Sequence, residues 1–448
     1  MQQDSPVDAA TTPAGAVPPR TLRGMAKALG PGFVVAMAWL GTGDLIDSAV
    51  AGANYGYALI WAMLLALGAR LIVTSSLAKY QLCNRIGDER ILQGYHRLWR
   101  GFPLAIGVGG LILAFTINGA IMTGAGTALH KLTGGLGGET WGPFICTVLA
   151  TAGAIALSRS RKEYKTIEWV ARAVVVILIA TFVFAVIRSG FSPWELVQGL
   201  AFEVPESVGV LGAGLVVVSL IGAVGGSVAN LLYGYLIEDK GWKGPAFRPL
   251  QRVDLWSGVA AMVLINLCVW IVAAENLSGR DITIESPEGL ATMMQFAVGD
   301  MGVPLLWLAL FAITFDNLHV WAYGFTKLFV DGLHLTAPRR SARYGDLKSD
   351  PLFRPLEIAF LLVLPLVFAL PGMPNMVVLT IVANSFNVFL IPGIIVGLVM
   401  LTSQRKYMGK FVNKWWETVL LVVIGLVGFW AVYHTAVGLG DLVAQLQS

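Results

Sequence analysis

Apolar segments of about twenty residues recur along the whole chain, and they restrict its fold more than any other feature. Hydrophobic residues make up 56% of the 448 residues, and charged residues only 13%. A segment buried in hydrocarbon must satisfy its own backbone hydrogen bonds, so it has to be a helix or part of a closed barrel. The length of these segments favours helices. The chain is therefore predicted to be an all-α integral membrane protein, embedded in a lipid bilayer, with about eleven transmembrane helices.

The predicted spans share this length and apolar composition, and they are residues 31–54, 57–82, 102–129, 141–158, 166–187, 208–235, 254–274, 302–330, 355–371, 375–402 and 416–437. Residues 1–28 differ from them. They are rich in Pro, Ala and Thr, contain three basic residues and have no apolar run. We expect a disordered cytoplasmic tail here, rather than a cleaved signal peptide.

Basic residues are distributed unevenly between the connecting segments. The tail and the alternate segments together hold 26 of the 31 Lys and Arg residues: 79–100, 159–165, 240–252, 327–354 and 405–414. Lys131, Arg188 and Arg280 lie in the other connections, and Arg70 and Arg172 in or near spans. Because basic loops stay on the cytoplasmic side, the pattern predicts a cytoplasmic N-terminus and an outer C-terminus in a bacterial-type inner (plasma) membrane. The net charge of +4 is then a topology signal, and no nucleic-acid partner is expected.

The first span is interrupted near its middle. After an apolar run that ends at Leu40 come Gly41-Thr42-Gly43-Asp44, and Asp47 follows three residues later. Gly weakens a helix by about 1 kcal/mol relative to Ala, and a charge near the bilayer centre costs at least about 2.5 kcal/mol. Backbone released from helical hydrogen bonds survives there only against protein or a water-filled cavity. A broken span with two carboxylates therefore indicates a solute site.

The sixth span is interrupted in a similar way, at Gly222-Ala223-Val224-Gly225-Gly226-Ser227. Gly-interrupted segments at corresponding positions of two halves indicate a transporter site. The alternative is that these glycines allow close helix packing. Eleven spans divide into two units of five and one more, and the second unit then starts on the opposite side. We expect an inverted repeat of residues 29–202 and 203–403, with 404–448 forming the eleventh span and the C-terminus.

Several motifs outside the breaks match those of a known family. They are Gly30-Pro31-Gly32-Phe33, Ala51-Gly52-Ala53-Asn54-Tyr55-Gly56-Tyr57, Ile221-Gly222-Ala223, Leu390-Ile391-Pro392 and Met408-Gly409-Lys410-Phe411-Val412-Asn413. With these motifs the chain resembles the Nramp family of divalent-metal transporters over most of its length beyond the tail. The resemblance implies a secondary transporter with the inverted-repeat fold of the amino-acid and sodium symporters. The chain shows no phosphate-binding loop, nucleophile–base set or His/Cys metal spacing, so neither enzyme activity nor a cofactor is expected.

The site motifs of that family are altered here. Where the family has Asp-Pro-Gly-Asn, this chain has Gly41-Thr42-Gly43-Asp44, so the metal-binding Asp is replaced by Gly and a carboxylate stands at the Asn position. The family's Met-Pro-His in the sixth span is absent, and residues 225–229 occupy that region. The acidic pair implicated in proton passage falls on Asn118 and Ile121. The resemblance thus implies fold and transporter class, and not the substrate.

Asp44 and Asp47 are the candidate metal ligands, because residues three apart share a helix face. Magnesium and similar hard cations take carboxylate, carbonyl and water oxygens, whereas thioether sulfur suits softer metals. Loss of the Met with retention of acid favours a hard divalent cation such as magnesium over manganese or iron. The alternatives are that Asp44 caps the outer half-helix and that Asp47 faces an outer vestibule.

The other candidate substrate contacts are small or amide residues of the first, sixth and tenth spans: Gly41, Thr42, Ala223, Gly225, Gly226, Ser227, Asn230, Asn384 and Asn387. A candidate coupling-ion site combines Asp316, Asn317 and His319 of the eighth span with Asn118 of the third. An internal pair between Asp316 and His319 is the alternative. Because Asn118 cannot change charge and Ile121 cannot carry a proton, we expect transport without proton coupling.

The leading hypothesis is thus a secondary transporter of a hard divalent cation such as magnesium. One rival is a transporter of a small organic or polyatomic solute, whose cavity lacks the Met and His ligands of the family. A second rival, from another class, is a membrane sensor that keeps the fold without transport. The lack of an appended signalling domain disfavours the sensor.

Overall fold

The computed structural model describes residues 42–158, 176, 179–209, 211–225, 228–280 and 282–447. For residues 42, 157, 158, 224, 225, 316–320 and 438–447 it describes the backbone alone. The predicted tail, Gly41 and the first half of the first span lie outside these ranges, as do Gly226 and Ser227.

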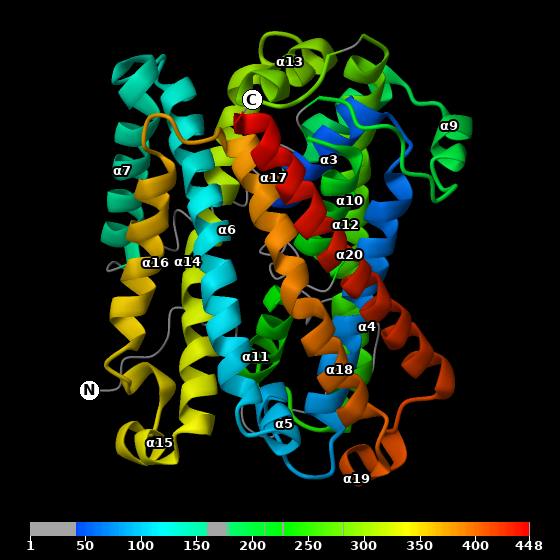
Figure 1. Ribbon diagram of the computed structural model, residues 1–448, viewed down its shortest axis with the longest axis vertical. Coiled ribbons are helices and arrows are strands. Elements are labelled where there is room, and N and C mark those ends of the chain that lie inside the picture. Colours follow the sequence, from blue (N-terminus) through cyan, green and yellow to red (C-terminus); the bar gives the residue numbers. More distant parts are fainter. Residues whose placement is uncertain are drawn as a thin grey trace.

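The described chain is built from helices, most of which run along the long axis of the molecule (Figure 1). The longer helices are α3 (Thr42–Tyr55), α4 (Ile60–Cys83), α6 (Phe102–Leu132), α7 (Gly138–Ser158), Ile179–Ser189, α12 (Arg248–Leu277), α13 (Pro287–Val298), α14 (Gly302–Thr336), α16 (Phe353–Phe368), α17 (Met376–Phe386), α18 (Ile391–Thr402) and α20 (Trp415–Gln447). The shorter helices are α5 (Ile91–Leu98), α9 (Pro193–Gln198), α10 (Ala213–Leu220), α11 (Leu232–Asp239), α15 (Pro338–Tyr344) and α19 (Arg405–Met408).

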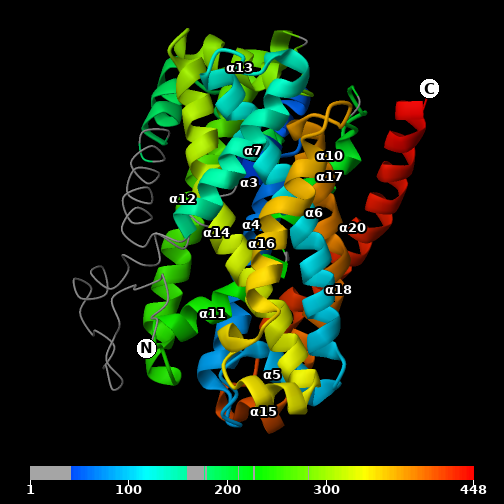
Figure 2. The same ribbon diagram turned by 90° about the vertical axis from the view of Figure 1, so that its left-hand side faces the viewer.

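Six segments of the described residues are long and apolar enough to cross a membrane, judged by length and composition. They are Ile60–Cys83, Phe102–Leu132, Ala213–Asp239, Pro245–Arg280, Met376–Thr402 and Trp415–Val437. Large apolar side chains also lie on the outside of the bundle, as on α20, where Val419, Leu426 and Phe429 are exposed. In the turned view of Figure 2, α20 lies at the edge of the bundle. The prediction of an all-helical membrane protein with several spans is confirmed, and the total of eleven stays a prediction.

The two ends of the bundle carry different charges. α5, α15 and α19 lie at one end, and α9 and α13 lie at the other (Figure 1). α15 contains Arg339, Arg340 and Arg343, whereas α9 and α13 contain Glu195 and Glu288 in their first turns. α5, α15 and α19 belong to three of the segments that were predicted to be cytoplasmic, and they lie at the same end of the molecule.

Two of the predicted spans are irregular in the middle. α10 passes into a π-helical turn (Ile221–Gly225), and a 3₁₀ turn (Val228–Leu231) leads into α11. Turns of this kind mark places where the backbone leaves regular hydrogen bonding, often at functional sites. The interruption predicted in the sixth span is thus present in the structure.

The second irregular span, the tenth, was not expected to be interrupted. α17 ends at Phe386, a 3₁₀ turn (Asn387–Leu390) follows, and α18 begins at Ile391. Pro392 lies in the first turn of α18. Because proline has no N–H and its ring clashes with the carbonyl four residues earlier, it ends the preceding helix.

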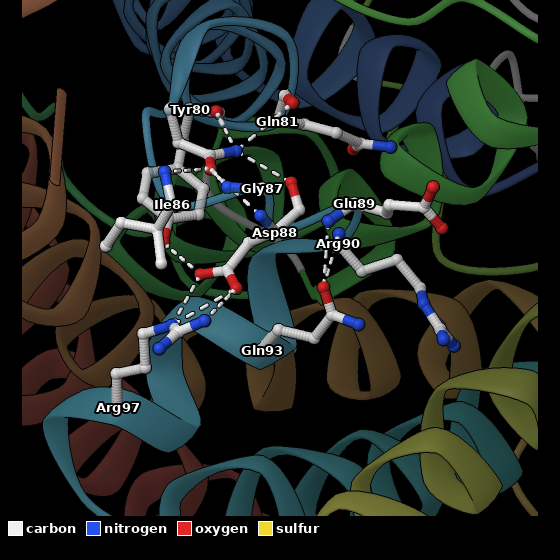
Figure 3. Close-up of polar contacts among 10 residues, drawn as sticks. Tyr80, Gln81, Ile86, Gly87, Asp88, Glu89, Arg90, Gln93 and Arg97 are labelled. Atoms are coloured by element: carbon white, nitrogen blue, oxygen red, sulfur yellow. Dashed lines mark hydrogen bonds and ion pairs between the residues drawn. The ribbon is translucent and has the colours of Figure 1, made fainter.

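A turn between α4 and α5 is held by a buried acid (Figure 3). Asp88 is 5% exposed, accepts a hydrogen bond from the Tyr80 hydroxyl at 2.7 Å, and is bound by both Nε and Nη2 of Arg97. Asn84 closes the turn, because its Oδ1 accepts the backbone N–H of Asp88 at 2.9 Å and its Nδ2 donates to the Asp88 carbonyl at 2.7 Å. The turn thereby places Arg90 at the start of α5.

From this position Arg90 helps to tie the end of the bundle together. Its Nη1 lies 2.8 Å from Oδ1 of Asp331 on α14, and the Tyr235 hydroxyl of α11 donates to the other oxygen of Asp331 at 2.9 Å. Gln81 of α4 donates to the Gly234 carbonyl of α11 at 2.8 Å. The second half of the interrupted sixth span is therefore bound to α4, α5 and α14.

The loop after α15 offers a test of electrostatic stability outside the spans. Arg340 donates to both oxygens of Asp350, and His334 and the Leu352 backbone N–H also contact this carboxylate. The hydrogen bonds from Arg340 hold the pKa of Asp350 well below its usual range. A carboxyl with a depressed folded-state pKa stabilises the fold above its unfolded pKa, and this contribution is lost as the pH falls towards the folded value.

We therefore expect the Asp350→Asn variant to be less stable than the wild type at neutral pH. The difference should shrink progressively as the pH falls below about 4, because the carboxyl is protonated first in the unfolded state and in the folded state only at a much lower pH. Thermal unfolding in detergent across this pH range measures both effects. Asp346→Asn, an exposed acid of the same loop, is the control. A constant difference between wild type and Asp350→Asn at all pH values would contradict the assignment.

Candidate substrate-binding site

The candidate site lies where α3 and the irregular sixth span meet α17. α3 and the π-helical turn after α10 both pack against α17; these helices lie together in the centre of Figure 1. Two glycines allow the approach: a Cβ on Gly43 would lie 2.8 Å from Nδ2 of Asn384, and a Cβ on Gly222 would collide with the Asn384 carbonyl oxygen. Asn384 is therefore a shared contact of the first and sixth spans.

Asp47 is held inside this junction. Its carboxylate accepts hydrogen bonds from the Ser219 hydroxyl of α10 at 2.9 Å and from Nδ2 of Asn384 at 3.0 Å. The residue is 0% exposed, so it does not face an outer vestibule. Asp47 thus joins α3, α10 and α17 through one buried acid.

A small pocket lies beside Asp44, lined by Gly43, Asp44, Ile117, Ala120, Ile121, Ala223, Trp321, Thr380, Ala383 and Asn384. Asp44, Thr380 and Asn384 contribute polar side chains, and the other walls are apolar. Asp44 is 4% exposed and is the third residue of α3, inside its first turn. A carboxylate in the first turn is stabilised by the positive end of the helix dipole. Asp44 is thus a buried first-turn residue of α3 that lines the pocket.

Arg70 of α4 stands behind Asp44. The guanidinium Nη1 is 3.9 Å from Oδ2 of Asp44, and Nη2 donates to the Ala223 carbonyl at 2.9 Å. Nη1 also lies 3.3 Å from the Met262 sulfur on α12. Arg70 is 2% exposed and is not among the residues that line the pocket, whereas Asp44 and Ala223 are. The site therefore contains a buried positive charge beside the Asp44 carboxylate.

Sequence reasoning placed Arg70 in or near a span and gave it no role. The signal was available, because a charged residue in the middle of an apolar span is rare and marks a functional site by default. What the sequence does not give is the partner, which lies 26 positions away on another helix. The positive charge of the site was missed for this reason.

The other candidates occupy varied positions. Nδ2 of Asn118 donates to the Phe360 carbonyl of α16 at 2.7 Å, and Asn118 is not a lining residue of the pocket. Asn230 and Asn387 are buried in the 3₁₀ turns of the sixth and tenth spans. The Ala223 carbonyl accepts the hydrogen bond from Arg70. Of the remaining candidates, Gly41, Gly226 and Ser227 lie outside the described residues, and for Thr42, Gly225, Asp316, Asn317 and His319 the structure describes the helix and not the side-chain surroundings.

Within the described residues, no group of three or more His, Cys, Asp or Glu side chains lies close enough to hold a metal ion. Among the residues that line the pocket, Asp44 has a carboxylate, and Thr380 and Asn384 carry neutral oxygen atoms in their side chains. Carboxylate and neutral oxygens are the ligand types that magnesium takes.

A model of one protein family matches residues 32–437 of the chain; the family is described as Natural resistance-associated macrophage protein-like. The divalent metal cation transporter MntH of Mycobacterium tuberculosis is 27% identical over 426 residues, which cover 92% of each chain. The corresponding protein of Bacillus subtilis is 23% identical over 429 residues and 91% of each chain.

Solved structures show the same arrangement of helices. The Eremococcus coleocola manganese transporter, solved with an aromatic bis-isothiourea compound, superposes with a TM-score of 0.65 at 15% identity, covering 98% of this chain and 97% of that one. The transporter MhsT in complex with L-phenylalanine gives a TM-score of 0.53 at 15% identity, covering 92% and 98%. At these identities the likeness concerns the fold.

Proposed function

Since the chain belongs to the Nramp family, as its motifs predicted, we propose that it is a secondary transporter that moves a hard divalent metal cation such as magnesium. The family is one of membrane transporters, so the chain is a multi-pass membrane transporter and not an enzyme. The metal-transporting relatives support a metal substrate. The choice of ion comes from the residues of this chain.

The observation that carries the proposal is the buried Asp44 carboxylate, which lines a pocket at the junction of the interrupted spans. Its neighbours in the pocket, Thr380 and Asn384, supply further oxygens. The Met262 sulfur lies against Arg70 and is not a lining residue of the pocket. Oxygen donors without a sulfur donor favour hard, partly hydrated cations over soft ones.

Titration calorimetry on the purified transporter tests the selectivity. Magnesium should give a binding signal, and cadmium should bind poorly. Met262→Leu is the matched control, because it removes the sulfur that contacts Arg70 outside the pocket lining and should leave the magnesium signal unchanged. Tight cadmium binding without a magnesium signal would refute the proposed selectivity for hard ions.

Transport is proposed to run without proton coupling. Ile117, Ala120 and Ile121 form the α6 wall of the pocket and cannot titrate, and Asn118 is bound to α16. In proteoliposomes loaded with a pH-sensitive dye, magnesium uptake should therefore cause no matching internal acidification. Stoichiometric proton entry would overturn this part of the proposal. Loss of that signal in Asp316→Asn would then locate the proton path in the eighth span.

A second candidate substrate is a small organic or polyatomic solute. It is favoured by the mostly apolar lining of the pocket and by the lack of a three-ligand group among the described side chains. If no divalent ion binds in the calorimetric experiment, a thermal-shift screen of organic solutes becomes the deciding measurement.

We further propose the orientation that the basic segments predict, with the N-terminus in the cytoplasm of a bacterial-type cell and the C-terminus outside. The end of the bundle with α5, α15 and α19 would then face the cytoplasm. The two inverted units, 29–202 and 203–403, and the final segment 404–448 remain part of this proposal.

A further inference from the structure

Arg70 is the feature of the site that the proposed function does not use. It is almost fully buried in the middle of α4; its carboxylate partner Asp44 lies in the first turn of α3, and its carbonyl partner Ala223 lies in the π-helical turn of the sixth span. A charge in such a place is costly unless it is paired and hydrogen-bonded. A functional role for Arg70 would explain why a charge with such a free-energy cost of burial is present.

The Asp44 carboxylate has different neighbours on two sides. The side that faces the pocket is where a substrate cation would arrive, and Arg70 approaches from another side, outside the pocket lining. Substrate and guanidinium can therefore both interact with the same carboxylate. Their charges have the same sign, so each weakens the interaction of the other with Asp44.

A transporter that binds its substrate cation through a carboxylate must also return to its starting conformation without the cation. A bare carboxylate in the interior is destabilising, and a second cation that travels with the empty protein removes this penalty. A guanidinium attached to the protein can serve in this way without any ion from solution. Arginine is suited to the purpose because it stays charged under all conditions found in proteins.

We propose that Arg70 is a tethered counter-cation, which neutralises Asp44 whenever the substrate cation has left and so allows the empty transporter to return. The inference rests on the proposed function, because it requires a cation as substrate. Binding of the substrate weakens the Asp44–Arg70 pair, and release restores it.

The Ala223 carbonyl extends this exchange to the sixth span. It accepts a hydrogen bond from Arg70 at 2.9 Å, and Ala223 also lines the pocket. When the substrate draws Asp44 away from Arg70, the same carbonyl is in place to contribute an oxygen to the ion. Carbonyls of interrupted helices are used for cations in this type of fold.

The test separates net uptake from exchange in proteoliposomes. Net magnesium uptake requires return of the empty protein, whereas exchange of internal magnesium for isotopically labelled external magnesium does not. Arg70→Gln should lower net uptake by about tenfold or more, since several kcal/mol of charge compensation are lost. The exchange rate of Arg70→Gln should stay within about threefold of the wild type. Arg70→Lys keeps the positive charge, so its net uptake should also stay within about threefold of the wild type.

Each outcome has a defined meaning. Equal loss of net uptake and exchange in Arg70→Gln, or no loss of either, would overturn the proposal for Arg70. Equal damage by Arg70→Lys and Arg70→Gln would assign the effect to the hydrogen bond at Ala223 rather than to charge, and would also overturn it. A wild type that neither takes up nor exchanges magnesium would instead disprove the proposed cation transport.

A second measurement covers the case in which Arg70→Gln does not fold. A double-mutant cycle on thermal stability with Asp44→Asn, Arg70→Gln and the combined variant should show that the combined variant recovers stability lost in the single ones. The coupling should be present without magnesium and smaller at saturating magnesium, because the substrate weakens the pair. An additive cycle under both conditions would contradict the proposal.

Discussion

Asp44→Asn is expected to abolish transport, because it removes the one carboxylate that lines the pocket among the described residues. Asn keeps the shape of the side chain but cannot offset the charge of a divalent cation. Uptake into proteoliposomes measures the loss, and elution as a single species shows that the variant folds. Asp300→Asn, which alters an exposed acid far from the pocket, is the matched control.

Removal of Asp44 also leaves Arg70 without this carboxylate. Breaking a buried ion pair can cost about 3–5 kcal/mol, so Asp44→Asn is expected to lower thermal stability as well. The combined variant with Arg70→Gln should be more stable than Asp44→Asn alone and equally inactive. Wild-type turnover in a folded Asp44→Asn protein would remove Asp44 from the site.

Gly222→Ala is expected to lower the stability of the protein. The added Cβ would meet the backbone carbonyl of Asn384, which cannot rotate away as a side chain can. Overpacking of this kind typically costs about 1–3 kcal/mol. Thermal unfolding in detergent measures the effect, and binding should weaken in parallel because Asn384 lines the pocket.

Gly214→Ala is the control for this substitution, because it lies in α10 of the same span and a Cβ there meets nothing within 4 Å. Alanine in a helix is favoured over glycine by up to about 1 kcal/mol, so this variant should be as stable as the wild type or slightly more stable. If both variants lost stability equally, the contact with Asn384 would not be the cause.

Much of the helix pattern could be predicted from local properties of the chain. Apolar length gave the spans, and the glycines of 222–227 gave the interruption of the sixth span, because both signals lie within a few consecutive residues. The interruption of the tenth span was missed, although Pro392 stood in one of the motifs. Pro392 was an available signal for this division, although a proline alone does not decide it, because α16 continues through Pro365.

The composition of the site was harder to predict, because it depends on which faces of separate helices meet. The resemblance directed attention to Asn118 as a coupling-ion residue, whereas its neighbours Ile117 and Ile121 line the pocket. Successive helical residues point about 100° apart, so the right segment does not identify the right side chain. Arg70 shows the complementary case, in which the decisive partner is distant in sequence and near in space.

The contact between Gly43 and Asn384 has a consequence for the size of the pocket. A Cβ at position 43 would lie 2.8 Å from Nδ2 of Asn384, and the same amide nitrogen donates to the buried Asp47 carboxylate. Gly43 and Asn384 both line the pocket. The missing side chain at position 43 therefore acts as a spacer of zero length, which sets how closely α3 approaches α17 and how much room is left between them.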